Sequence, residues 1–169
     1  RPDVEIHLPD GRVLSGPRSA AISEFFKAIE FNAPVMGAVV NHELHELNYP
    51  IEIDSHVQPI TLDMADGARI YRRSLTFVLE MAFADLFPKG KLTIDHSVAS
   101  GGFYCHVIDR KPLNELEFAN LKAHIQELID ADLPFKRQEV PLTEAIAQFK
   151  KLGYDDKVHL LKYRKKDYL

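Results

Sequence analysis

The sequence predicts an α+β protein with two domains. Short alternating apolar segments, which predict strands, are interspersed with helical patterns along the 169 residues. Charge is also divided unevenly. Residues 1–66 contain 4 Lys+Arg and 11 Asp+Glu, a net charge of −7, whereas residues 67–169 contain 17 and 14, a net charge of +3. We therefore expect a boundary after residue 66, where Asp66-Gly67 interrupts the pattern.

The first domain is predicted to have the element order ββαβββ. Its opening strand alternates apolar and polar residues and returns after Pro9-Asp10-Gly11, a tight-turn sequence. The expected strands cover residues 4–8, 12–15, 35–40, a short stretch after the Asn41-His42 turn, and 57–62, with one helix between Ser19 and Asn32. This order in about 65 residues indicates a β-grasp unit, a small sheet that curves around one helix.

The second domain is predicted to combine helices with an antiparallel sheet. A long helix is expected at residues 68–86 and an amphipathic helix at 114–131. The second helix is expected to face the core with Leu116, Leu121, Ile125 and Leu128. Further segments are predicted as strands at 92–94, 103–108, 135–140 and 157–162, and as a short helix at 144–152 that Gly153 closes. The helices are expected to pack on one face of the sheet.

Composition excludes several classes of protein. One cysteine rules out an internal disulfide framework and fits a reducing cytoplasm, where we expect this protein. No apolar run reaches the roughly 18 to 20 residues that span a bilayer, so no membrane partner is expected. The acidic first domain is unsuited to binding nucleic acid by itself, because neutralisation of phosphates dominates that affinity.

Three arginines form a stripe on the predicted helix at residues 68–86. Arg69, Arg72 and Arg73 recur at helical spacing, so they share one side of the helix. They are candidates to bind a phosphate, an RNA backbone or a small anionic ligand. The alternative is a solvated stripe in which Arg73 pairs with a nearby acid.

His96 and Tyr104 are the other candidate ligand-binding residues. Cys105 and His106 are adjacent on a predicted strand and face opposite sides, so at most one of them can join His96. Two ligands do not complete a zinc site, and we predict no metal. We also predict no catalytic residue, because neither Ser97 nor Cys105 has an evident activating partner.

Short motifs resemble the N-terminal part of threonyl-tRNA synthetases. Leu8-Pro9-Asp10-Gly11 and the segment 39–44 are similar to the TGS domain, a β-grasp module. Ser74, the helix that follows it and Gly102-Phe103-Tyr104 resemble the next domain, which hydrolyses mischarged tRNA and is shared with alanyl-tRNA synthetases. That family carries His-x-x-x-His where this chain has Arg73 and Phe77, and neither of these side chains can bind a metal.

A second resemblance extends over the whole chain. The segments 71–75, 95–97 and Tyr104-Cys105 resemble uridine kinase-like proteins, in which TGS and degenerate editing-like domains precede a P-loop kinase domain. The resemblance implies a non-catalytic regulatory or RNA- or ligand-binding region, with the kinase domain as its partner. ATP and Mg²⁺ would then belong to the full-length protein, since no Gly-x-x-x-x-Gly-Lys-Ser/Thr loop occurs here and no cofactor is expected in this part.

The alternative function is an aminoacyl-tRNA editing hydrolase, related to threonyl-tRNA synthetase, with an altered active site. It predicts tRNA as the partner, and it requires metal or water activation by residues beyond Leu169 or by His96. Hydrolysis of mischarged tRNA by this chain would favour this alternative over the regulatory function.

Overall fold

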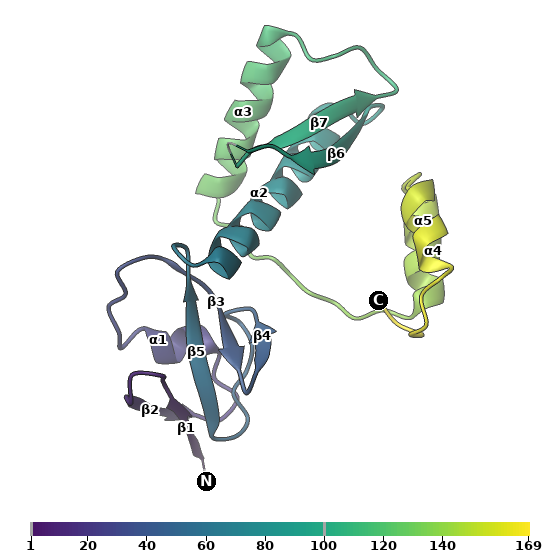
Figure 1. Ribbon diagram of the computed structural model, residues 1–169. Helices are drawn as coiled ribbons and strands as arrows, with labels where there is room; N and C mark the ends of the chain where they lie inside the picture. The colour runs from purple at the N-terminus through teal and green to yellow at the C-terminus, as the bar shows by residue number, and fades with distance from the viewer. Residues whose placement is uncertain (1, 100) are drawn as a thin grey trace. The chain divides into compact units, whose positions relative to one another are not determined.

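The computed structural model describes residues 2–99 and 101–169 and confirms the predicted α+β class (Figure 1). Its elements are β1 (Asp3–His7), β2 (Val13–Pro17), α1 (Ile22–Phe26), β3 (Val35–Val40), β4 (Glu43–His45), β5 (Ser55–Thr61), α2 (Ala65–Leu86), β6 (Lys91–Ser97), β7 (Phe103–Ile108), α3 (Glu115–Asp130), α4 (Leu142–Lys151) and α5 (Asp155–Leu161). The chain divides into a larger unit that ends at Asp130 and a smaller unit of residues Ala131–Leu169. The predicted boundary after residue 66 stays a prediction.

The first five strands form one mixed sheet with the order β2-β1-β5-β3-β4. β1 is antiparallel to β2 and parallel to β5, while β3 is antiparallel to both of its neighbours. The alternating pattern buries one face of this sheet. Ile6 of β1 and Ile22 of α1 are both fully buried in its core. The predicted order of strands and helix is therefore observed, and membership of the TGS family stays a prediction.

A two-residue turn joins β3 to β4, as the sequence predicts. Asn41 and His42 have positive φ angles of 47° and 76°, the conformation of the turns that best match the twist of a hairpin. The Asn41 side chain also accepts a hydrogen bond from the His56 backbone N–H at 3.0 Å, which ties the turn to β5. Asparagine tolerates this backbone conformation better than most residues.

A close backbone contact fixes where α2 begins. Gly67 lies in the first turn of α2 against the backbone of Thr61, and a Cβ atom at position 67 would overlap the Thr61 carbonyl. Only glycine leaves room for this approach. Farther along α2, Ala82 and Phe83 form a second core with Leu121 of α3 and with Leu92 and Val107 of the β6–β7 hairpin.

Asn114 and Glu117 form reciprocal capping hydrogen bonds at the N-terminal end of α3. The Asn114 side chain accepts the Glu117 backbone N–H at 2.9 Å, and the Glu117 carboxylate accepts the Asn114 backbone N–H at 3.1 Å. Glu117 also accepts a hydrogen bond from Arg110 at 2.6 Å, and the Arg110 guanidinium lies 4.3 Å from the centre of the Phe87 ring. The prediction that Leu116 faces the core is wrong, because Leu116 is 72% exposed.

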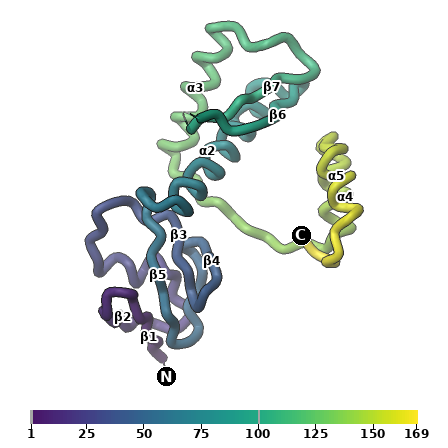
Figure 2. Tube along the Cα trace, in the orientation of Figure 1, coloured from purple at the N-terminus to yellow at the C-terminus, as the bar shows by residue number. Residues whose placement is uncertain are grey.

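Two predicted strands in the smaller unit are wrong. Residues 135–140 form no strand, and Val140 instead makes two backbone hydrogen bonds with Leu169. The C-terminus therefore lies beside the segment that leads into α4 (Figure 2). Residues 157–162 lie mostly in α5, which starts with Asp155 and Asp156 and buries Leu161. Acidic residues stabilise the N-terminal end of a helix, and the burial of Leu161 within the smaller unit favours the helix over the strand that Val158 alone would prefer.

Candidate functional site

The predicted arginines lie on α2 but differ in their contacts. The Arg69 guanidinium donates to the Asp66 carboxylate at 2.8 Å, so part of its charge is offset. Arg72 and Arg73 are exposed, and Arg72 lies near Gly101 in the β6–β7 connection. Among the described residues, no acid pairs with Arg73, and both the binding role and the solvated stripe stay predictions. Phe77, one turn later, is 58% exposed.

A β-bulge arranges the side chains of the β6–β7 hairpin. Ile94 pairs with Cys105 and His96 pairs with Tyr104, so Asp95 is the extra residue between two successive pairs. Without the bulge, Asp95 and His96 would face opposite sides of the hairpin. With it, both lie on the exposed face, together with Tyr104 and with His106, which pairs with Thr93.

We call Asp95, His96, Tyr104 and His106 the hairpin site. The His106 Nε2 atom lies 3.2 Å from Asp95 Oδ2, and His96 Nδ1 lies 3.8 Å from the same oxygen. The Tyr104 ring stacks on His96 with centroids 5.4 Å apart and meets the edge of His106 at 4.7 Å. One carboxylate thus lies beside two imidazoles, which flank an exposed tyrosine.

The hairpin site faces away from the helices. Leu92 and Val107 occupy the opposite face of the hairpin, where they pack against Phe83. Cys105 shares that inner face, and burial raises the pKa of its thiol. A thiol with a raised pKa stays protonated at neutral pH and is a weak nucleophile. Cys105 is therefore a poor candidate for a nucleophile. Of the two adjacent residues, His106 is the one that lies on the same face of the hairpin as His96.

The chemistry open to the hairpin site is proton transfer. A carboxylate beside one ring nitrogen fixes the tautomer of an imidazole and leaves the other nitrogen as a base. Across the described residues, no group of three histidine, cysteine or acidic side chains has the geometry of a metal site. The candidates His96 and Tyr104 are brought together, whereas Asp95 and His106 were not predicted as site residues. Only the bulge places Asp95 there, and no local sequence pattern reveals it.

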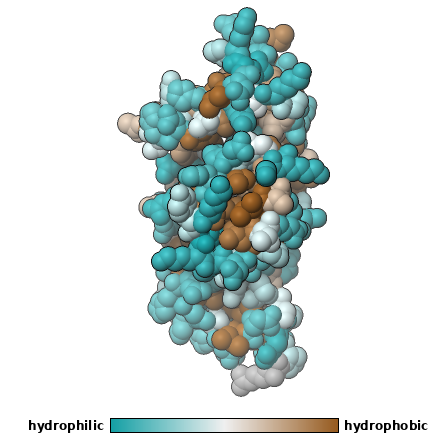
Figure 3. Space-filling view, turned by 90° about the vertical axis from the view of Figure 1, so that its right-hand side faces the viewer, coloured by the Kyte–Doolittle hydropathy of each residue, from teal (hydrophilic) through white to brown (hydrophobic). Residues whose placement is uncertain are grey.

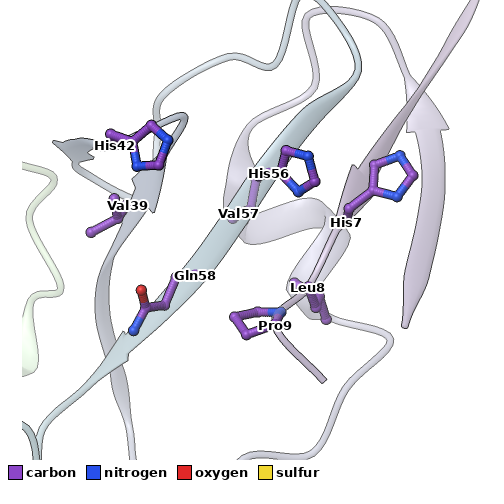
Figure 4. A pocket seen from close by; sticks show the side chains of 8 residues that line it. All are labelled: His7, Leu8, Pro9, Val39, His42, His56, Val57 and Gln58. Atoms are coloured by element: carbon purple, nitrogen blue, oxygen red, sulfur yellow. The ribbon is translucent and has the colours of Figure 1, made fainter. Parts of the chain in front are cut away.

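A shallow groove of about 170 Å³ lies on the sheet of the larger unit (Figure 4). Its lining residues are His7, Leu8, Pro9, Val39, His42, His56, Val57 and Gln58. The rings of His7 and His56 come from neighbouring strands, with their centroids 5.4 Å apart, and His42 is exposed as expected for a turn residue. The groove is open and no acidic side chain lines it, although Glu5 Oε2, next to it on β1, lies 3.9 Å from His7 Nε2. We assign the groove no chemistry.

Apolar side chains also reach the surface at several places among hydrophilic ones (Figure 3). Phe103, Tyr104 and Ile108 on β7 are each more than a third exposed. Tyr104 and Ile108 share the face of His106, so the exposed face of the hairpin combines imidazoles with aromatic and apolar surface, whereas Phe103 alternates onto the face of Cys105. In the part of the chain that the structure describes, no helix has the length and apolar character needed to cross a bilayer.

Comparisons with known proteins identify relatives of this chain. No family model matches it. A threonine–tRNA ligase of Symbiobacterium thermophilum is 30% identical over 160 residues, which cover 94% of this chain and 24% of the relative. Threonine–tRNA ligases of Desulforamulus reducens and a Geobacter species are 28% and 29% identical, again over 94% of the chain and 25% of their own length.

The chain is homologous to part of the threonine–tRNA ligases. It spans about a quarter of the length of these relatives. This finding overturns the predicted function, a regulatory region of a uridine kinase-like protein. It gives no support to the predicted kinase-domain partner. The segments that suggested a kinase relative are two to five residues long, and such short matches cannot outweigh similarity over nearly the whole chain.

Proposed function

We propose that this chain is the editing region of a threonine–tRNA ligase-like protein and that it hydrolyses mischarged aminoacyl-tRNA through an altered site. The observation that carries this proposal is the similarity to threonine–tRNA ligases over 94% of the chain. The His-x-x-x-His pair of the resembling family is absent, and we propose that another group of this chain acts as the base. The hairpin site supplies one.

In the proposed reaction, His106 is the general base. Asp95 lies 3.2 Å from Nε2, which favours the tautomer that keeps the proton there and leaves Nδ1 free. Nδ1 takes a proton from water as the water oxygen attacks the ester carbonyl carbon. The ester bond to the ribose then breaks, and the departing ribose oxygen takes the proton from the imidazolium. The products are the free amino acid and uncharged tRNA.

Other candidates have binding roles in this proposal. Tyr104 presents an exposed ring on which a terminal base can stack, with His96 behind it at 5.4 Å. Arg72 and Arg73 on α2 are proposed phosphate contacts, since neither is neutralised by a described acid. Arg69 contributes less, because Asp66 already pairs with it at 2.8 Å.

The proposal is tested by deacylation of one tRNA charged with serine or with threonine. Serine lacks only a methyl group, a difference that a binding pocket alone discriminates by roughly 10- to 200-fold. We expect faster hydrolysis of the seryl ester, and a loss of roughly 100- to 10,000-fold in His106→Gln. His56→Gln, a matched change of an exposed histidine on β5, is expected to retain the rate. Equal hydrolysis of both esters, or equal loss in both variants, would contradict the proposal.

A further inference from the structure

The positive charge of the second half of the sequence is concentrated in the smaller unit. Residues 131–169 contain nine lysines and arginines against six acidic residues, whereas residues 67–130 contain eight of each. Four of the nine fall within five residues, at Lys162, Arg164, Lys165 and Lys166. This segment follows α5 directly, and all of its side chains are exposed. We call Lys162–Lys166, with Tyr163, the basic loop.

The charges of the basic loop are not neutralised. None of its four cations forms an ion pair with a carboxylate in the described part of the chain. The Arg164 Nε atom donates to the backbone carbonyl of Tyr168 at 2.8 Å, and the Lys166 ammonium lies 5.5 Å from the Tyr168 ring centre. Both contacts leave the full positive charge in place, so it is available to an anionic partner.

Backbone hydrogen bonds join the residues that follow the basic loop to the segment before α4 and to its first residue. The Leu142 N–H donates to the Asp167 carbonyl at 2.8 Å, just beyond the loop. Val140 and Leu169 exchange two further hydrogen bonds at 2.9 and 3.0 Å, which secure the last residue against the segment before α4. The C-terminal end of the basic loop is therefore anchored within the smaller unit.

An exposed aromatic ring lies among these cations. Tyr163 is 73% exposed, and the ring of His159 lies edge-on to it, with centroids 5.4 Å apart. Cations interleaved with an exposed aromatic side chain are the combination that binds single-stranded nucleic acid, through phosphates and a stacked base. An acidic polypeptide would use the charges but has no planar base to place on Tyr163.

We propose that the basic loop binds a single-stranded segment of RNA, with phosphates on its four cations and one unpaired base on Tyr163. The choice of RNA as the occupant rests partly on the proposed function, because the relatives are tRNA ligases. The binding surface itself is separate from the hairpin site. It lies wholly within residues 131–169, and its effect is measurable with RNA that carries no amino acid.

The test measures binding of a fluorescent single-stranded RNA to the whole chain over a range of salt concentrations. Replacing Lys162, Arg164, Lys165 and Lys166 by Gln is expected to make the slope of log K against log salt shallower by about 3, since each phosphate contact contributes about 0.7. Tyr163→Ala is expected to weaken binding by about 5- to 150-fold and to leave the slope unchanged. Both changes alter exposed side chains, and circular dichroism checks that the fold persists.

Two controls make the result decisive. A variant with Lys27, Lys89, Lys111 and Lys122 replaced by Gln loses the same charge at exposed positions elsewhere and is expected to keep most of the slope. A similar loss of slope in this control would overturn the proposal, as would competition by polyglutamate as strong as that by unlabelled RNA. Loss of deacylation with RNA binding intact would instead count against the proposed function alone.

Discussion

Replacement of Phe83 by alanine tests the core that holds the hairpin. The Phe83 side chain is 1% exposed and packs with Leu92 and Val107 on the inner face of the hairpin and with Leu121 of α3. Its ring centroid lies 5.0 Å from that of Phe87. Removal of a fully buried phenyl ring loses its transfer free energy and leaves a cavity, a combined cost of about 3–5 kcal/mol in free energy of unfolding.

The assay is urea unfolding followed by circular dichroism, with hydrogen exchange of the β6–β7 amides to locate the loss. The matched control is Phe118→Ala, because Phe118 lies on α3 of the same unit and is 62% exposed. Phe118→Ala is expected to change the free energy by no more than about 0.5 kcal/mol. Similar effects of the two changes, or protected hairpin amides in Phe83→Ala, would refute this account of the core.

Three further predictions concern positions outside the hairpin site. Gly67→Ala is expected to lower the midpoint of thermal unfolding, because the new Cβ would overlap the Thr61 carbonyl. The comparison variant is Ala68→Gly, and an unchanged midpoint for Gly67→Ala would argue against the close contact. Hydrogen bonds to Glu127 and Asp85 raise the pKa of His124, so its stabilisation is fully present below the ordinary histidine pKa and is lost as pH rises through the folded-state value. Urea midpoints from pH 5.5 to 8.5 should show this decline in the wild-type chain and a weaker one in His124→Gln; parallel curves would count against it. The hydrogen bond from Arg110 lowers the pKa of Glu117. The stability that Glu117 contributes is therefore present above the ordinary glutamate pKa and is lost as pH falls through the folded-state value. Acid titrations of Glu117→Gln should not show this loss, and the same acid loss in that variant would contradict the pairing.

The sequence predicted elements well where one pattern dominated. The predicted ranges of β3 and β7 coincide with those observed. β3 is a short apolar run, and β7 lies between a glycine and an aspartate that mark its ends, so the sequence leaves few other boundaries for either strand. The pattern failed at 157–162, where Val158 and Leu161 fit a strand and a helix about equally, and packing within the smaller unit decides for the helix.

The candidate site was predicted only in part for a different reason. His96 and Tyr104 are the predicted residues that meet, and they do so because they pair across the hairpin. The position of Asp95 depends on a bulge in that pairing, which is a property of two strands together and not of either alone. The link between His124 and Asp85 likewise joins residues far apart in the sequence.

The central claim, that Asp95 positions His106 as the base, is tested most directly by a double-mutant cycle on seryl-tRNA hydrolysis. The account predicts that His106→Gln lowers the rate by roughly 100- to 10,000-fold and that adding Asp95→Asn to this variant costs nothing further, because Asp95 acts only through the imidazole. Full activity in His106→Gln, or losses that multiply in the double variant, would contradict it.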